Sequence, residues 1–112
     1  MDEGLLRVEC GMSIRHKQQR FTIALAKLII YGDSIGCGFA VGDAYATTGH
    51  IKNSTHYHCL AIDLNMFVED VYVEDSENHL WEKLHDYWEE LGGSKMIPRD
   101  ANHFSFKHNG VR

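Results

Sequence analysis

The chain has few cysteines, little positive charge and no long hydrophobic segment. Its three cysteines, Cys10, Cys37 and Cys59, are an odd number without CxxC spacing, so no disulfide framework is expected and a reducing compartment at synthesis is favoured. Eleven Lys and Arg residues stand against sixteen Asp and Glu, a net charge of −5, which argues against binding to nucleic acid. The apolar stretch at residues 23–31 contains Lys27 and is shorter than the ~20 residues that span a bilayer, so no membrane insertion is expected.

The sequence shows no recognisable secretion signal, phosphate loop or second domain. No basic region opens the N-terminus, Met1 to Gly4, so no secretory signal peptide is predicted. The glycines within residues 32–38 do not belong to a GxxxxGK[ST] phosphate loop. At 112 residues, 44% hydrophobic and 24% charged, the sequence predicts one globular domain over residues 1–112, with residues 1–12 as an extended lead-in.

Histidine is the residue type present in unusual number. Eight histidines occur in the 112 residues. Imidazole is the commonest metal-ligating side chain in proteins, and it is the side chain most easily tuned near neutral pH. The positions of the histidines therefore bear directly on function.

Apolar residues at helical spacing predict a first amphipathic helix. It begins near Ser13, and glycines end it between Tyr31 and Gly36. Its apolar residues recur with the spacing of a helix face packed on a core, and they are Phe21, Ala24, Leu25, Leu28 and Ile29.

A second amphipathic helix is predicted in the C-terminal half. Ser76 or Asn78 is available as its N-cap, and Gly92-Gly93 ends it. Its apolar stripe consists of Leu80, Trp81, Leu84, Tyr87, Trp88 and Leu91. His79 and His85 lie away from this stripe and are expected to face solvent.

Alternation of apolar and polar residues predicts strands between and after the helices. Residues 39–45 are expected to form a short strand, and residues 59–67 a longer one with period two. Residues 68–73 are a candidate second arm of a hairpin with Glu69-Asp70 at its turn, and residues 103–108 a last strand. This order predicts an α+β fold with a small antiparallel sheet and flanking helices.

Two polar segments carry the candidate chemistry. Residues 54–63 contain His56 and Asp63, and residues 100–104 contain Asp100 and His103. A catalytic zinc site needs three protein ligands of N or O type and one position left for water. His56, Asp63 and His103 would supply two imidazoles and one carboxylate. Asp100, three residues before a ligand, would stand beside the metal-bound water without binding the metal.

The two segments resemble the motifs of the zinc D-alanyl-D-alanine peptidases and phage L-alanyl-D-glutamate endopeptidases (peptidase M15), which share a fold with the Hedgehog signalling domain. The first motif, SxHxxGxAxD, is matched by Ser54, His56, Ala61 and Asp63, with Cys59 at the usual Gly or Arg position. The second, an acidic residue followed after two positions by His and an aromatic, is matched by Asp100, His103 and Phe104. Residues 42–45 and 88–93 also look like the phage branch, and the resemblance covers roughly residues 21–111.

The resemblance implies a zinc hydrolase that cuts the peptide stems of bacterial peptidoglycan, at L-Ala–D-Glu or a D-Ala-containing bond. Zinc would be bound by His56, Asp63 and His103, and Asp100 would be the general base. Zinc lowers the pKa of its bound water toward ~7 and polarises the scissile carbonyl. Asp100 would take the proton of the attacking water and pass it to the leaving amine.

Substrate contacts and location follow from the same resemblance. The candidate contacts are Ser54, Tyr45 and His50, although core packing explains Tyr45 and an ordinary loop histidine explains His50 equally well. The enzyme is expected to be endolysin-like and phage- or prophage-derived. It would accumulate in the cytoplasm of an infected bacterium and act on the wall after release, or it would be carried to the wall by a virion.

Ala46 is a departure from the family. The family usually has an arginine at this position, directly after the Tyr of the Gly-Asp-Ala-Tyr segment, where it helps to hold the substrate and the oxyanion. Loss of such a charge-assisted contact costs ~3 kcal/mol or more, about a hundredfold in rate. Either another cation such as Lys52 substitutes, or the activity is weakened, or Ala46 is an engineered inactivating change.

Two rival functions and several plainer explanations remain open. A non-catalytic zinc module that binds wall fragments or a protein partner is favoured by Ala46 and disfavoured by Asp100, since a binding module needs no such carboxylate. A metal-dependent nuclease is disfavoured by the net charge of −5. In the plainer explanation, the three ligand residues are unrelated polar residues of loops, and Asp100 is a turn residue after Pro98. Metals other than zinc also fit the same donor atoms.

The remaining reactive side chains have plainer expected roles. His58 is expected to be a pocket-wall residue or to support the ligands. His16 and His108 have no evident partner. Cys59 lies in the predicted strand, and we expect a packed thiol rather than a nucleophile.

Overall fold

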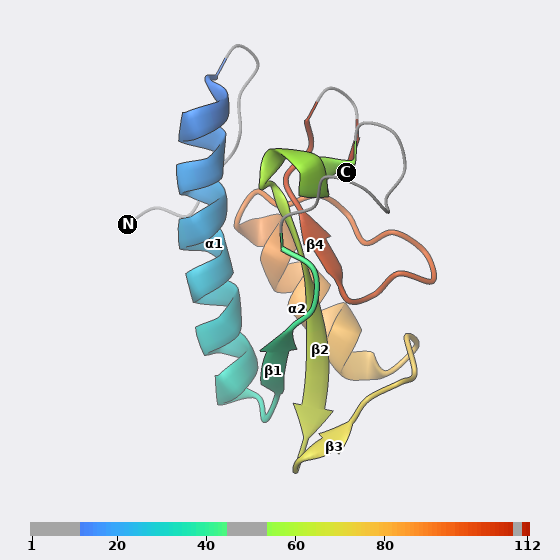
Figure 1. The fold of residues 1–112 in the computed structure, drawn as a ribbon. Coiled ribbons are helices and arrows are strands. Elements are labelled where there is room, and N and C mark those ends of the chain that lie inside the picture. Colours follow the sequence, from blue (N-terminus) through green and yellow to red (C-terminus); the bar gives the residue numbers. More distant parts are fainter. Residues whose placement is uncertain (1–11, 45–53, 109–110) are drawn as a thin grey trace.

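The computed structural model describes residues 12–44, 54–108 and 111–112, and within them the chain folds as the α+β arrangement that the sequence predicts (Figure 1). The elements, in chain order, are α1 (Ile14–Ser34), β1 (Gly38–Val41), the 3-10 helix η2 (Thr55–His58), β2 (Ala61–Val68), β3 (Val71–Tyr72), α2 (His79–Glu90) and β4 (His103–Ser105). A small antiparallel sheet and two helices therefore account for the described chain. None of its described helices is long and apolar enough to cross a membrane.

Strand β2 is the centre of the sheet. β1 pairs with it from Gly38–Phe67 to Val41–Leu64, β3 pairs with its last two residues, and β4 pairs with its first three residues. All three pairings are antiparallel. The predicted hairpin is confirmed, with Glu69 and Asp70 at the turn, both in left-handed backbone conformation. β1, β3 and β4 thus each pair directly with β2.

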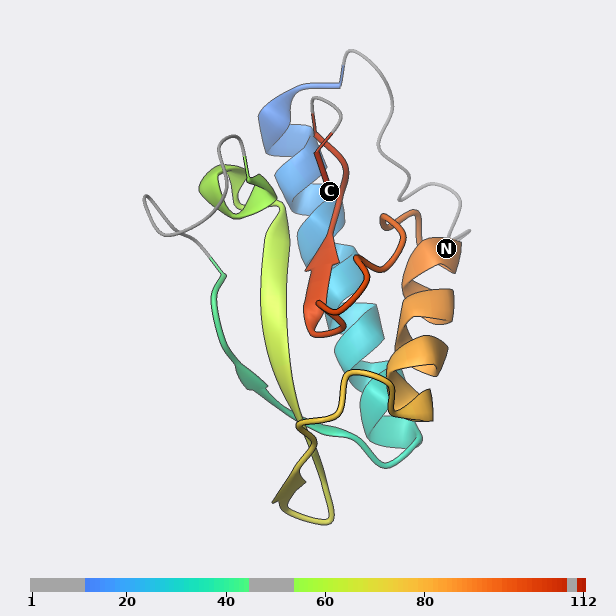
Figure 2. The same cartoon turned by 90° about the vertical axis from the view of Figure 1, so that its right-hand side faces the viewer.

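The alternation along β2 separates a core face from an open face. Ile62, Leu64 and Met66 are buried, while Asp63 and Asn65 between them are half-buried. Both helices lie to one side of β2 (Figure 2). The buried face of the strand joins one core cluster with α1 and α2, which contribute among others Phe21, Leu28, Trp81, Leu84 and Trp88. Asp63 consequently lies on the side of β2 opposite the apolar core residues.

The helix ends agree with the sequence analysis. Ser13 is the N-cap of α1, and its hydroxyl accepts a hydrogen bond from the His16 amide. Of the two candidate caps of α2, Asn78 is the one used: its side chain accepts from the Leu80 amide at 2.9 Å. The chain leaves α2 through Gly92, which has a φ of 101°, a conformation that glycine adopts without strain.

Two strands end earlier than predicted, and β2 begins at Ala61 rather than at residue 59. β1 ends at Val41 rather than at residue 45, because Gly42 and Asp43 both hydrogen-bond to the backbone of Asp63: the Gly42 amide donates to the Asp63 carbonyl, and the Asp63 amide donates to the Asp43 carbonyl. Gly42 and Asp43 thus lie opposite the single residue Asp63, and this bulge interrupts the regular hydrogen-bond ladder. β4 ends at Ser105, although the Phe106 amide still donates to the Leu60 carbonyl at 2.9 Å. The predicted lead-in lies, apart from residue 12, outside the described residues.

Candidate metal centre

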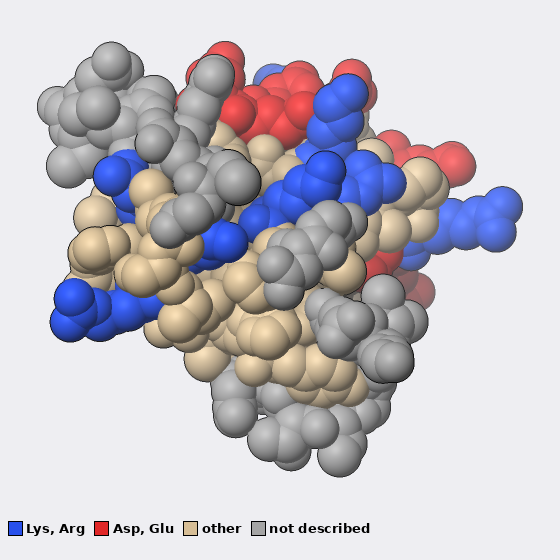
Figure 3. Space-filling view, turned by 90° about the horizontal axis from the view of Figure 1, so that it is seen from above, with Lys and Arg blue, Asp and Glu red and all other residues tan. Residues whose placement is uncertain are grey.

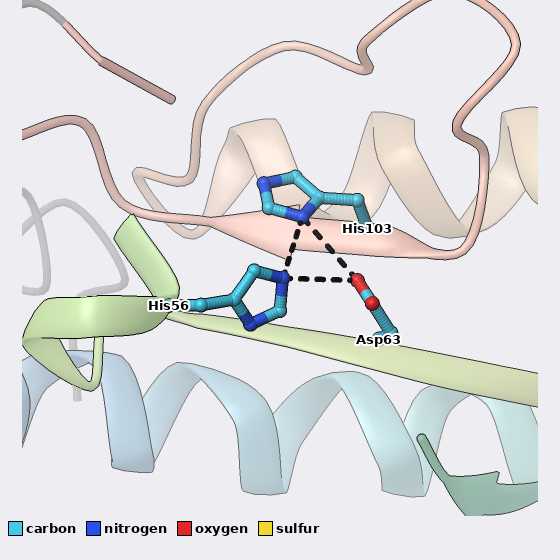
Figure 4. Close-up of side chains that lie close together, drawn as sticks. All are labelled: His56, Asp63 and His103. Atoms are coloured by element: carbon cyan, nitrogen blue, oxygen red, sulfur yellow. Dashed lines mark hydrogen bonds and ion pairs between the residues drawn. The ribbon is translucent and has the colours of Figure 1, made fainter. Parts of the chain in front are cut away.

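Three side chains from the predicted motifs converge at one point on the open side of β2 (Figure 4). Nε2 of His56 lies 3.2 Å from Oδ1 of Asp63 and 3.2 Å from Nδ1 of His103. The third side of the triangle, from Nδ1 of His103 to Oδ1 of Asp63, measures 3.3 Å. His103 is 40 residues from Asp63 and 47 residues from His56 in the chain, yet each of the three presents one donor atom to a common centre.

The triangle has the size that a small metal ion requires. Nitrogen and oxygen ligands lie about 2.0 Å from tetrahedral zinc, which separates any two of them by about 3.3 Å. The three measured separations are 3.2, 3.2 and 3.3 Å. In both donor type and spacing, the cluster could hold a metal ion.

Sheet register places two of the three ligands. Asp63 on β2 and His103 on β4 are directly paired residues of the antiparallel ladder. Paired residues in such a ladder project side chains to the same face, with their Cβ atoms about 5 Å apart. The neighbouring pair, Ile62 and Phe104, projects into the core, where both side chains are buried. The core pair fixes the register, and the register brings Asp63 and His103 together.

The third ligand, His56, comes from the short helix η2. The Ser54 hydroxyl caps this helix by accepting a hydrogen bond from the His56 amide at 3.3 Å. Cys59 follows in left-handed conformation, with a φ of 55°, and turns the chain into β2. Helix α1 also contacts the turn, since the Gln18 side chain donates to the His58 carbonyl at 2.8 Å. The serine of the motif thus has a local structural role.

The ligands influence one another's ionisation. Burial alone would raise the pKa of Asp63, but hydrogen bonds and charge from His103 and His56 lower it well below its usual range. Burial likewise opposes the charged form of His56, yet Asp63, the Ala44 backbone and the charge of Asp43 raise its pKa. Asp63 is therefore a carboxylate at neutral pH, and the negative charge that favours a proton on His56 would also favour a metal cation.

The cluster opens into a pocket of about 380 Å³. The described residues that line the pocket are Ser54, His56, Asp63, Ile97, Asp100, His103 and Arg112. Asp100 is exposed, its amide donates to the Ile97 carbonyl at 3.0 Å, and its carbonyl accepts from the His103 amide at 3.1 Å. Two consecutive turns, over residues 97–100 and 100–103, therefore hold Asp100 at the pocket, three residues before the ligand His103.

The structure brings together Ser54, His56, Asp63, Asp100 and His103 of the predicted site. Tyr45 and His50, the other candidate substrate contacts, lie outside the described residues, as do Ala46 and Lys52. Arg112 lines the pocket as well, although no sequence pattern predicted it. It belongs to neither motif, and no spacing along the chain connects it to them.

Two side-chain predictions are wrong. His85 is 3% exposed rather than facing solvent: its ring stacks on Phe104 with centroids 4.2 Å apart, and Nε2 donates to the Ala101 carbonyl. Cys59 lies at the turn before β2 and is exposed rather than packed. A polar ring is readily buried when it has both an aromatic neighbour and a hydrogen-bond acceptor.

The other histidines lie away from the cluster. His58 does not line the pocket, and its ring packs against that of His108 with centroids 4.6 Å apart. His108 also has a partner that the sequence did not reveal, because Lys17 Nζ lies 3.1 Å from its Nδ1. His16 and His79 are exposed.

Comparisons with models of known protein families and with curated proteins give no match for this chain.

Proposed function

We propose that the protein is a zinc-dependent peptidoglycan peptidase with the Hedgehog/DD-peptidase fold. It hydrolyses a stem-peptide bond, L-Ala–D-Glu or one containing D-Ala, and it is an endolysin-like enzyme of phage origin that acts on the wall of its bacterial host. The observation that carries the proposal is the triangle of His56, Asp63 and His103 donor atoms, 3.2 to 3.3 Å on each side, which opens into a pocket beside Asp100.

The ligand set favours a catalytic over a structural zinc site. Structural zinc sites are closed by four protein ligands, whereas catalytic sites have three and leave a position for water or substrate. Within the described residues the cluster contains only His56, Asp63 and His103. Its two imidazoles and one carboxylate match a donor set found in zinc hydrolases.

The residues around the ligands supply the rest of the chemistry. Zinc, when bound, supplies an activated water and polarises a carbonyl oxygen. Asp100 lies at the same pocket, and in the described part of the chain its carboxylate has no hydrogen-bond partner. It is therefore available to accept the proton of the attacking water and to deliver it to the leaving amine. Asp63 faces both histidines and would bind the metal together with them, so it is not the proton acceptor.

A second candidate function is a weakened or inactive zinc module that binds wall fragments or a protein partner. Ala46 favours it, since related peptidases have an arginine at the position that the resemblance assigns to this residue. The two candidates share the metal site and differ in turnover. They are therefore separated by an assay of bond cleavage rather than by one of metal binding.

Digestion of purified peptidoglycan tests the proposal. We expect the zinc-loaded protein to release new stem-peptide termini, identified by mass spectrometry, and a chelator to abolish them. Asp100→Asn removes the proton acceptor while retaining the size of the side chain, and we expect it to keep zinc and lose about 10²- to 10⁴-fold in rate. Absence of cleavage by zinc-loaded wild-type protein would favour the binding module, and an Asp100→Asn variant as active as wild type would exclude Asp100 as the base.

A further inference from the structure

Arg112 is the one Lys or Arg residue among the described residues that line the metal pocket. Its side chain is exposed, and within the described part of the chain it makes no hydrogen bond or ion pair. In particular, it is not paired with Asp63 or Asp100, the two carboxylates of the same pocket. Since no described residue accepts a hydrogen bond from this guanidinium, it is available to a ligand.

Contacts with segments that are distant in the sequence place Arg112 at this pocket. His108 and Val111 form an isolated antiparallel bridge, with reciprocal backbone hydrogen bonds of 2.8 and 2.9 Å. His108 is in turn held by Lys17 of α1 at 3.1 Å and by the ring of His58, with centroids 4.6 Å apart. His58 belongs to η2, the helix that supplies the ligand His56. The bridge therefore ties the segment that carries Arg112 to the elements that build the site.

The chemistry of a guanidinium decides what the ligand must offer. Arginine binds a carboxylate through two parallel charge-assisted hydrogen bonds, and it remains charged at all relevant pH values. We propose that Arg112 binds a carboxylate of the ligand and so makes the metal pocket selective for anionic peptides over neutral ones. This assignment rests on the proposed function, because it takes the ligand to be a peptide.

A general attraction by positive charge is the competing explanation. Lys95 and Lys107 line an adjoining hollow of about 550 Å³, and Arg112 lines both this hollow and the metal pocket. Seen from above, Lys and Arg side chains form a band across this end of the molecule (Figure 3). A charge effect of the whole band would be similar for Lys107 and Arg112, whereas a specific contact depends on Arg112 alone.

Binding of a matched pair of peptides distinguishes these explanations. The probes are D-alanyl-D-alanine and its C-terminal amide, which differ in the carboxylate and hardly in size, and calorimetry gives their affinities for the zinc-loaded protein. The Asp100→Asn background slows turnover during the measurement. We expect the acid to bind about tenfold more tightly than the amide, as a hydrogen bond to a charged group permits.

Variants assign that preference to a residue. We expect Arg112→Gln to reduce the preference for the acid to within about twofold without changing the affinity for the amide, and Arg112→Lys to retain part of it because the charge remains. Lys107→Gln, the matched loss of one positive charge, should leave the preference intact. Three results would overturn the assignment: no acid preference or no binding in the Asp100→Asn background, an unchanged preference in Arg112→Gln, or an equal loss in Lys107→Gln.

This test and the peptidase test fail separately. A protein that cuts no peptidoglycan but prefers the acid through Arg112 has the anion subsite without the proposed activity. A protein that cuts peptidoglycan and binds acid and amide equally has the activity without the subsite.

Discussion

The three ligand side chains reach the centre of the site through one strand pairing and one capped turn. Asp63 is positioned by its place on the open face of β2, and His103 by direct pairing with it. His56 is positioned by a capped turn, in which the Ser54 hydroxyl accepts from its amide. The sequence motifs identified all three residues, but they do not explain why the side chains meet. The pairing of β2 with β4 and the Ser54 cap of η2 explain it.

His85 makes a prediction about stability and pH. Burial lowers its pKa, against the opposing effect of the hydrogen bond with the Ala101 backbone. The unfolded chain, where histidine titrates near 6.5, therefore binds more protons than the folded protein below that pH. We expect the free energy of unfolding to fall as pH decreases below about 6.5, with a contribution of up to about 1.4 kcal/mol per pH unit from His85.

The matched variant for this prediction is His85→Gln, whose side-chain amide can still donate to the Ala101 carbonyl but does not titrate. Urea unfolding of both proteins between about pH 5 and 8, on either side of the ordinary histidine pKa, would give the difference in their pH dependence. The account requires a shallower decline in the glutamine variant below about pH 6.5. Identical slopes would show that His85 is protonated equally in the folded and unfolded states.

At the scale of secondary structure, the alternation along β2 was predicted correctly, although the strand begins at Ala61 rather than at residue 59. Its strict alternation of apolar and polar residues is visible in the sequence, and burial in the structure follows it at Ile62, Leu64 and Met66. The misprediction of His85 has a simple cause. It was assigned to a position away from the apolar stripe, but the buried residues Trp81 and Trp88 lie four residues before it and three residues after it, on the same face of α2. Its polar ring is satisfied by the Ala101 carbonyl, which lies just before β4, and no spacing in the sequence reveals that partner.

The turn between η2 and β2 carries a second prediction. Cys59 has a φ of 55° and a ψ of 37°, a left-handed conformation that costs an L-residue with a side chain about 1 kcal/mol and glycine almost nothing. Its side chain is exposed, so little packing is lost on replacement. We expect Cys59→Gly to raise the free energy of unfolding by about 0.5 kcal/mol, after the greater flexibility of glycine in the unfolded chain is subtracted.

Cys59→Ala is the control for the turn, because it removes the thiol and retains the backbone cost. Chemical denaturation should place the alanine variant within about 0.5 kcal/mol of wild type and the glycine variant above both. A glycine variant less stable than the alanine variant would show that the thiol or its packing, rather than the backbone, determines stability at this position.

For the whole molecule, the sequence was sufficient for the fold class and insufficient for the walls of the site. Periodicity predicted both helices and the strands that pair with β2, because each of these patterns is local. Arg112 could not be found in this way, since it reaches the pocket through the bridge of Val111 with His108 and the contacts of His108 with α1 and η2. Pocket walls assembled from distant segments leave no regular spacing in the chain.

The central claim is that His56, Asp63 and His103 bind one metal ion, and the zinc content of three proteins tests it most directly. Wild-type protein, His103→Ala and His79→Ala would be loaded with zinc, dialysed and measured by atomic absorption. His79 is exposed on α2 and outside the cluster, so its variant controls for the loss of a histidine. The account predicts a single zinc ion per chain in wild type and in His79→Ala, and strongly reduced zinc in His103→Ala. Equal zinc content in His103→Ala and wild type would contradict it.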